Sequence, residues 1–233
     1  MAKNFKPLFF TVFIFLTVGS IASASASANA NANAYPGVFA CAVADAKVPL
    51  SSGHRNVLAE ARSRITTTFG AVEAQAIIIC FDDENAFWPL KLNTYGTTSF
   101  IGSKSCVVIG PNGQNVDVTA HELMRAEIAH RTGYWQRFTQ LLTWYDEVLA
   151  MQVDYRPRYE TDTGLTEDYV WSLSSARAFF LADDRQLRDH YAAAKFQVVQ
   201  WVSNVGASSF YSYLQRVQEG EPFETVVPLN ASG

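Results

Sequence analysis

The feature that most constrains the fold is a change of hydrophobic pattern at Gly110-Pro111-Asn112-Gly113, a strong turn signal. Before this turn the chain carries two short β-branched runs, residues 74–81 and 105–109, which are typical of buried strands. The polar, Thr-rich stretch 93–99 between them indicates a hairpin-like region. After the turn, apolar residues recur at helical spacing. Strands followed by helices predict an α+β domain, with a small N-terminal sheet packed on a helical part.

The predicted helices are defined by their apolar spacing and by the residues that end them. The central one runs through His121 to about His130, capped by Asp117 or Thr119 and closed by Gly133. The others are 56–69, a stretch from Trp144 to Met151, 191–202 ending near Gly206, and 210–217 ending at Gly220.

Residues 1–28 have the pattern of a signal peptide. Lys3 and Lys6 precede an apolar run over 8–16, and the small-residue run 22–28 offers several cleavage sites. The apolar run is shorter than the ~20 residues that span a bilayer, with an uncleaved anchor helix as the alternative. We therefore expect an exported protein, periplasmic or secreted, with no membrane span after cleavage. An Asn/Ala-rich and extended segment, 29–55, then precedes a single domain, 56–233.

Charge and cysteine content narrow the function classes. The formal net charge is -4 and no basic stripe occurs, which argues against a nucleic-acid partner. Cys41, Cys80 and Cys106 form no CxxC pair, so a structural zinc knuckle is not indicated. In an oxidising compartment we expect one disulfide and one free thiol. Cys80 and Cys106 each border a strand-like run, and we favour that pair.

The segment with chemical meaning begins at His121-Glu122. A zinc-hydrolase helix carries histidines at i and i+4, so that both rings face one metal. The glutamate beside the first histidine polarises the metal-bound water and takes its proton, a role that would fall to Glu122. Position i+4 here is Arg125.

The sequence from His121 to Asp154 resembles the gluzincin metallopeptidases, specifically the small exported peptidase-MA-like proteins. The features that carry the resemblance are the His121–Arg125 motif, Arg131-Thr132-Gly133, the segment Leu142-Thr143-Trp144-Tyr145-Asp146-Glu147-Val148-Leu149-Ala150, and a tail with Tyr191-Ala192-Ala193-Ala194-Lys195, Trp201, Gly206 and Gly220-Glu221-Pro222-Phe223. The resemblance covers about 77–227. It implies a helical zincin-like domain with an active-site helix, a zinc cofactor, and Glu147 as the third metal ligand.

Two departures from that family pattern stand out: Arg125 replaces the second histidine, and Val148 replaces the usual glycine after the ligand glutamate. Catalytic zinc normally takes three protein ligands, and a guanidinium cannot donate to a cation. With only His121 and Glu147 left, we expect zinc to be absent or weakly bound. We expect Arg125 to turn inward and bridge Glu147, Glu122 or both, against the alternative that it turns outward to solvent.

No other histidine or glutamate is positioned by the sequence to replace the missing ligand. His130 and Glu127 follow His121 by nine and six residues, which places them on other faces of the same helix. His54 and His190 are distant in sequence, and we expect them to be surface or hydrogen-bonded residues.

Three functions follow from this pattern. The first is a catalytically impaired pseudo-peptidase that binds a peptide or protein segment by β-augmentation, at the strand 105–109 or the hairpin before it. The alternative is an active metal-dependent peptidase with an atypical ligand set, Glu122 as general base, and Tyr145 or Tyr191 as a phenolic donor. The third is an exported structural domain. We expect the larger aromatic residues to be core: Phe87, Trp88, Trp144, Trp171 and Trp201.

Overall fold

The computed structural model describes residues 50–83, 94–101, 104–157, 164–180 and 183–227. The predicted signal peptide and residues 29–49 of the segment 29–55 lie outside these ranges, as do Phe87 and Trp88. The end of that segment is not extended, because α3 begins at Ser52. No helix within them is both long and apolar enough to cross a membrane. The elements are α3 (Ser52–Phe69), β1 (Ile77–Cys80), β2 (Gly96–Ile101), β3 (Lys104–Ile109), η2 (Pro111–Gly113), α5 (Val116–Thr132), α6 (Tyr134–Thr139), α7 (Thr143–Ala150), η3 (Met151–Val153), α8 (Glu167–Ser172), α9 (Ala176–Phe180), α10 (Asp184–Val205), η5 (Ala207–Ser209), α11 (Phe210–Gln218) and α12 (Phe223–Val226).

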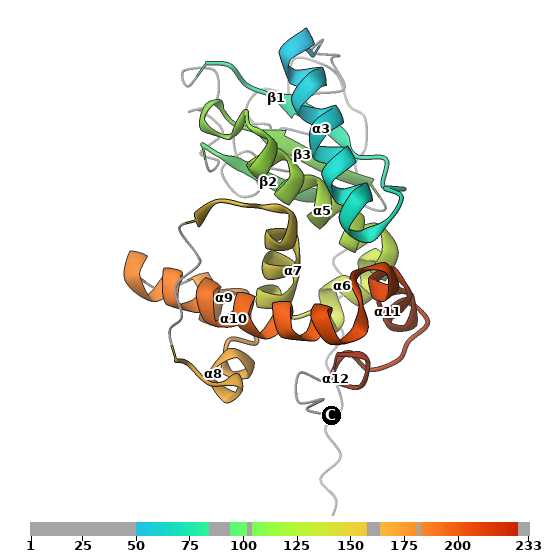
Figure 1. Ribbon diagram of the computed structural model, residues 1–233, viewed down its shortest axis with the longest axis vertical. Coiled ribbons are helices and arrows are strands. Elements are labelled where there is room, and N and C mark those ends of the chain that lie inside the picture. The colour runs from blue at the N-terminus through green and yellow to red at the C-terminus, as the bar shows by residue number, and fades with distance from the viewer. Residues whose placement is uncertain (1–49, 84–93, 102–103, 158–163, 181–182, 228–233) are drawn as a thin grey trace, which may run out of the picture.

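The sheet has the order β1-β3-β2 and stands with α3 in the upper half of Figure 1. β1 runs parallel to β3, while β2 and β3 form an antiparallel hairpin, as the Thr-rich stretch predicted. Val107 and Val108 of the central strand are fully buried, which explains its continuous apolar run. A small sheet packed with helices, of which only α3 precedes it among the described elements, confirms the predicted α+β class.

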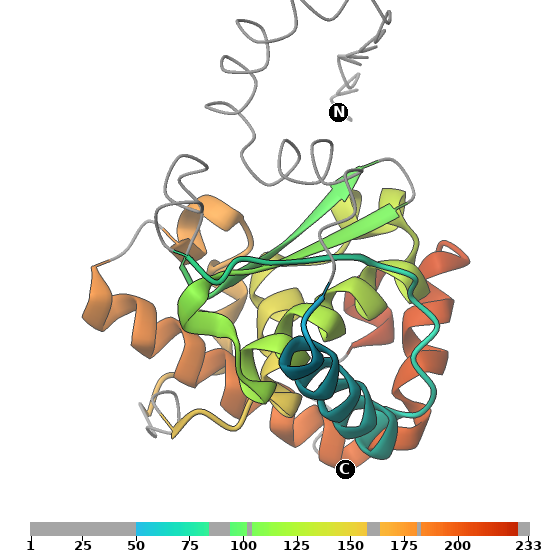
Figure 2. The same ribbon diagram turned by 90° about the horizontal axis from the view of Figure 1, so that it is seen from above.

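Helix α5 connects the sheet to the helical half of the molecule. It contacts β2 and β3 on one side, α7 and α11 on another, and packs side by side with α3 (Figure 2). The predicted caps Asp117 and Thr119 are wrong: Asn115 caps the helix, because its side chain accepts a hydrogen bond from the Val118 N–H at 3.0 Å. Gly133 does end the helix, with φ 81°.

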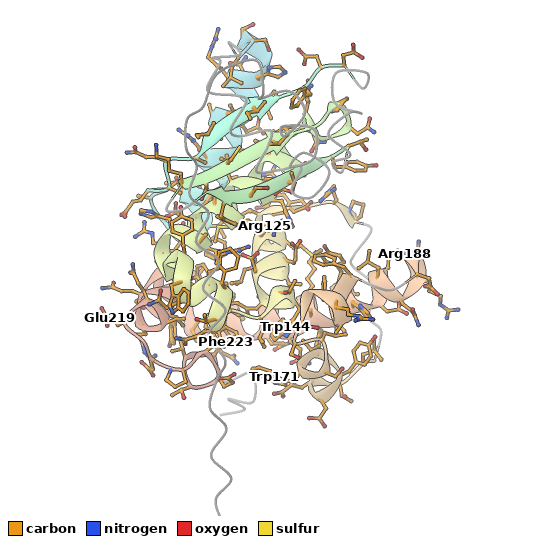
Figure 3. All side chains as sticks on the ribbon, turned by 180° about the vertical axis from the view of Figure 1, so that it is seen from behind. Arg125, Trp144, Trp171, Arg188, Glu219 and Phe223 are labelled. Carbon is orange, nitrogen blue, oxygen red and sulfur yellow. The ribbon has the colours of Figure 1, made fainter. Side chains whose placement is uncertain are left out.

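The helical half is built around aromatic side chains. Trp144, Trp171 and Phe223 gather there, while Arg125 lies where this half meets the sheet (Figure 3). Trp144 and Trp201 are almost completely buried, and Trp171 packs partly buried against the same core, so these three are core residues as predicted. α10 begins well before the predicted residue 191, because Asp183 caps it through the N–H groups of Arg185 and Gln186.

The favoured disulfide between Cys80 and Cys106 is wrong. Cys106 is disulfide-bonded, whereas Cys80 is a free thiol. In the sheet, Cys80 is in register with Ile109 and Cys106 with Ile77. The two cysteines are therefore offset by three positions, roughly 10 Å along the strands, and a disulfide needs Cα atoms about 4.4–6.8 Å apart. Burial and the neighbouring Asp82 raise the pKa of the Cys80 thiol to about 11.

Candidate functional site

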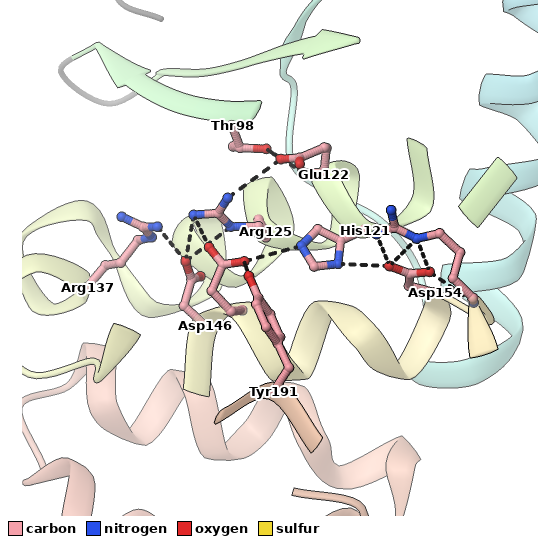
Figure 4. A network of polar contacts seen from close by, with 10 residues as sticks. Thr98, His121, Glu122, Arg125, Arg137, Asp146, Asp154 and Tyr191 are labelled. Atoms are coloured by element: carbon pink, nitrogen blue, oxygen red, sulfur yellow. Dashed lines mark hydrogen bonds and ion pairs between the residues drawn. The ribbon is translucent and has the colours of Figure 1, made fainter. Parts of the chain in front are cut away.

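The site is assembled from two helices. α5 supplies His121, Glu122 and Arg125 within about one turn, and α7 supplies Asp146 and Glu147 from below (Figure 4). The four ionisable side chains of His121, Glu122, Asp146 and Glu147 are each less than 10 % exposed. Buried charges at this density must be paired.

Arg125 turns inward, as the sequence predicted. Its Nη2 lies 2.9 Å from Oε1 of Glu147, and Nη2 and Nε donate to Oδ2 of Asp146 at 3.2 and 3.3 Å. Its Nη1 lies 3.7 Å from Oε2 of Glu122. Burial by itself would lower the pKa of the guanidinium, but Glu147, Asp146 and Glu122 raise it above the ordinary value. A permanent cation therefore lies among three carboxylates.

His121 lies between two more carboxylate contacts. Its Nε2 is 3.5 Å from Oε2 of Glu147, and its Nδ1 is 3.4 Å from Oδ2 of Asp154. Both distances are longer than usual for hydrogen bonds, and Nδ1 is buried without a hydrogen-bond partner among the described residues. Burial opposes protonation, but Asp154, Glu147 and Glu122 outweigh it and raise the pKa of His121 to about 9. Burial likewise opposes ionisation of Glu147, yet Arg125 and His121 lower its pKa to about 2.

Glu122 faces the sheet as well as Arg125. The hydroxyl of Thr98, on β2, donates to Oε2 of Glu122 at 2.6 Å and to its main-chain oxygen at 2.9 Å. The strand can approach this closely because position 96 is a glycine: a Cβ there would lie 3.0 Å from Cγ of Glu122. Gly96 and Thr98 thus fix the distance between the edge strand and the carboxylate.

A cavity of about 470 Å³ opens over these side chains. It is lined by Tyr95, Gly96, Thr97, Val118, His121, Glu122, Arg125, Glu147, Arg156, Phe180 and Tyr191. Of the two phenols considered from the sequence, Tyr191 faces the cavity and donates to Oε2 of Glu147 at 3.1 Å. Tyr145 does not: it is completely buried against Trp201 and Phe223.

Sequence reasoning missed five charged or polar contributors: Thr98, Arg137, Asp146, Asp154 and Arg156. Asp154 backs His121 and is itself held by Arg156, whose Nε lies 2.8 Å from Oδ1. Arg137 of α6 donates to Oδ2 of Asp146 at 2.6 Å, so that carboxylate is shared between two arginines. Asp146 lies within the segment 142–150 that carries the family resemblance, and Asp154 is the last residue of the stretch 121–154. Their place in these segments was the sequence signal that could have identified them as site residues. Arg137 and Thr98 gave no signal, because only the folded chain brings Arg137 to Asp146 of α7 and Thr98 to Glu122 of α5.

The remaining candidate residues lie elsewhere. Glu127 accepts hydrogen bonds from the Glu73 and Ala74 N–H groups, on another face of α5. His130 is 43 % exposed. His54 contacts Asp82 at 2.9 Å, and Nδ1 of His190 lies 2.8 Å from the Phe179 oxygen. Both distant histidines are hydrogen-bonded, as expected, and neither approaches His121.

The donor set does not fit a catalytic zinc ion. His121 and Glu147 face each other, but Arg125 bonds the Glu147 carboxylate directly and supplies no lone pair. Within the described ranges, no group of three or more His, Cys, Asp or Glu side chains is arranged to hold a metal ion.

Comparisons with protein-family models, with curated proteins and with solved structures gave no match for this chain.

Proposed function

We propose that this chain is an exported, gluzincin-like protein with an incomplete zinc site that binds an extended peptide or protein segment with little or no cleavage. The observation that carries the proposal is the 2.9 Å contact between Arg125 and Glu147. The resemblance implies that the Glu147 carboxylate is a metal ligand. Arg125 occupies this carboxylate, and a guanidinium cannot itself bind a metal ion.

The charges of the site support the proposal that the Arg125 guanidinium replaces a metal cation. A metal ion between His121 and Glu147 would neutralise the buried carboxylates, and Arg125 does this from α5 with Nε, Nη1 and Nη2. A planar guanidinium suits several carboxylates at once. In this proposal the domain retains the zincin-like fold and the cleft, while Arg125 stabilises the cleft in place of zinc.

The edge of the sheet supports peptide binding. The strand 105–109, one of the two edges considered from the sequence, is central and unavailable. β2, from the preceding hairpin, is at the end of the strand order among the described residues. The Tyr95 oxygen accepts from the Gly110 N–H, on the β3 side. Main-chain groups alternate along a strand, so those of Gly96, Thr98 and Phe100 point away from β3. An extended segment could pair there, beside the cavity.

One observation favours the alternative of a metal-dependent peptidase. The Asp154 carboxylate lies against Nδ1 of His121, Nε2 lies beside Glu147, and the residue lines the cavity. A carboxylate behind the ring is the arrangement that orients metal-binding histidines. We expect this support to be inherited from an ancestral site. It makes the chain suitable for a reconstruction experiment.

The zinc experiment decides between the two functions. After dialysis, elemental analysis of the unmutated protein is expected to give clearly substoichiometric zinc, and Arg125→His is expected to raise it toward one per chain. Arg131→His, which places a histidine on the same helix away from the cavity, is the matched control and should leave the zinc content unchanged. Stoichiometric zinc in the unmutated protein, with casein cleavage abolished by a chelator and by Glu122→Ala, would establish the peptidase instead.

The peptide experiment tests binding directly. A displayed library of ten-residue peptides is expected to yield binders to the unmutated protein. N-methylation of a selected peptide should weaken binding at every second residue, because only alternate N–H groups face β2. Equal effects at all positions would rule out strand pairing.

A further inference from the structure

We infer that Cys106 forms its disulfide with Cys41, and that the apolar segment 38–43 around Cys41 covers the face of the sheet opposite α5. The inference assigns a covalent cross-link and an occupant to that face. It is independent of the proposed function.

The number of cysteines leaves one partner for Cys106. The chain has three cysteines, Cys41, Cys80 and Cys106. Cys106 is disulfide-bonded and Cys80 is a free thiol, so Cys41 alone can complete the bond within one chain. The bond forms by thiol–disulfide exchange, in which the two thiols give up two protons and two electrons. A disulfide oxidant of the exported compartment accepts them and becomes a dithiol.

The sheet has one face toward α5 and one away from it. The Thr98 hydroxyl of β2 donates to Glu122 of α5, and Val107 of β3 is the cross-strand partner of Thr98, so this face lies against the helix (Figure 2). Successive side chains alternate between the two faces of a strand, so Cys106 and Val108 point to the opposite side. We call that side the outer face.

The outer face is buried, although no described helix covers it. Its central side chains are Ile79, which is in register with Val108, together with Val108 and Cys106; they are 3 %, 0 % and 1 % exposed. These three lie outside the hydrophobic core on the α5 side, which includes Val107 and Ile109. Among the described helices, only α5 packs closely along the sheet. Another part of the chain therefore lies on the outer face.

The sequence around Cys41 suits that position. Residues 38–43 read Val38-Phe39-Ala40-Cys41-Ala42-Val43, and none of the six is charged. Burying them on an apolar face is favourable and leaves no charge unpaired. Residues 84–93 are another apolar stretch outside the described ranges, but they contain no cysteine and include Glu84 and Lys91. The disulfide thus selects the segment around Cys41.

The chain between Cys41 and the described fold is long enough to reach this face. The described chain begins at Leu50, and the next residue, Ser51, lines a pocket together with Ile109 at the end of β3. Cys106 lies three residues back along β3, about 10 Å away. The nine residue steps from Cys41 to Leu50 span up to about 30 Å when extended. The linker can therefore pass from the start of α3 to the outer face.

Peptide mapping without reduction tests the bond. The full chain is exported, unfolded in the presence of iodoacetamide and digested with trypsin, which puts each cysteine on its own peptide because Lys47 and Lys91 lie between them. We expect the Cys41 and Cys106 peptides to be joined, and only Cys80 to be alkylated. An alkylated Cys41, a bond to Cys80, or a disulfide-linked dimer on a non-reducing gel would overturn the inference.

Limited proteolysis tests the covering. Elastase cuts after small side chains, and its rate of cleavage within 38–43 is compared between the folded, unmutated protein and a synthetic peptide of residues 35–47. We expect cleavage to be at least a hundredfold slower in the protein, because a covering segment must detach before it is cut. Rates within threefold of each other would mean that the segment is tethered without covering the outer face, and the inference would be wrong.

Two serine variants provide a matched comparison. Cys41→Ser breaks the bond, so elastase should cleave 38–43 at least fivefold faster than in the unmutated protein. Cys80→Ser removes the free thiol on the α5 side of the sheet and should leave that rate unchanged. Equal rates in Cys41→Ser and the unmutated protein would contradict the inference. If Cys41→Ser does not fold, the mapping and the synthetic peptide still decide.

These measurements are separate from the test of peptide binding at β2. The proposed function can therefore fail while the cross-link and the covered face stand, and the reverse also holds.

Discussion

Helix α5 carries two arginine–carboxylate clusters that differ in how fully they are bonded. The Arg131 cluster consists of Arg131, Glu127, Glu73 and Tyr211. Both oxygens of Glu127 are used, by Arg131 at 2.7 Å and by the N–H groups of Glu73 and Ala74. Arg131 also lies 3.0 Å from Glu73 and 4.3 Å over the Tyr211 ring.

The Arg125 cluster consists of Arg125, Glu122, Asp146 and Glu147, and it is only partly bonded. It lies beneath a cavity, with an unbonded donor on Arg125 and an unbonded acceptor on Glu122 among the described residues. The comparison teaches that a buried ion pair is not by itself a sign of function. Unused hydrogen-bonding capacity facing a cavity distinguishes the binding site from the structural cluster.

The largest expected effect is the difference in the free energy of unfolding between variants of Arg125 and of Arg131. Arg125→Met should lower the free energy of unfolding by about 3–5 kcal/mol at pH 7, because it strips the close cation from buried Glu147. Arg131→Met should cost about 2 kcal/mol, since Glu127 keeps two main-chain donors. Urea denaturation measures both, and the comparison breaks if Arg131→Met proves the more destabilising.

For the two glutamates the order should be reversed: loss of Glu127, in the Arg131 cluster, should destabilise the protein more than loss of Glu122, in the Arg125 cluster. Glu127→Ala leaves the N–H groups of Glu73 and Ala74 without their acceptor, and should cost about 3 kcal/mol. Glu122→Ala removes one hydrogen bond, from Thr98, and should change the free energy of unfolding by about 1 kcal/mol or less. Guanidinium denaturation provides the measurement. A loss above that of Glu127→Ala would make Glu122 structural.

The pH dependence of stability should report on Glu147 of the Arg125 cluster and on the neighbouring His121. Glu147 has a pKa of about 2 in place of 4.5, so the stability that it contributes is present above 4.5 and lost as pH falls toward 2. His121 has a pKa of about 9 in place of 6.5, so its contribution is present below 6.5 and lost as pH rises toward 9. Stability should therefore peak between these limits and decline on each side by about 1–3 kcal/mol.

Two histidine variants check the alkaline side of that profile. His121→Gln should flatten the decline above pH 6.5 in thermal or urea unfolding. His130→Gln removes an exposed histidine beside the other cluster and should leave the decline in place. An unchanged decline in His121→Gln would assign it to another group.

The smallest expected effect compares two tyrosines. Tyr191→Phe removes the hydroxyl that donates to Glu147 at 3.1 Å and should cost about 1 kcal/mol. The Tyr211 hydroxyl is buried with no hydrogen-bond partner in the described part of the chain, so Tyr211→Phe should fall within about 0.5 kcal/mol of the unmutated protein. Thermal unfolding of the two variants side by side distinguishes them.

Local rules account for what could be predicted of the fold. The strand and helix types were predicted, because hydrophobic period and turn residues act over a few positions. The boundaries were less accurate: Asn115, not Asp117, caps α5, and α10 starts at Asp184 instead of near Tyr191. The disulfide was mispredicted because strand register, which separates Cys80 from Cys106, depends on pairing across the sheet.

The sequence by itself determined that His121 and Arg125 share one face of a helix, because that follows from 3.6 residues per turn. It also determined that Arg125 cannot ligate a metal, because that follows from the guanidinium. Only the tertiary structure decided that Asp154 backs His121, that Arg137 shares Asp146, and that Thr98 holds Glu122. Those contacts join residues from separate elements, and their geometry depends on how the elements pack.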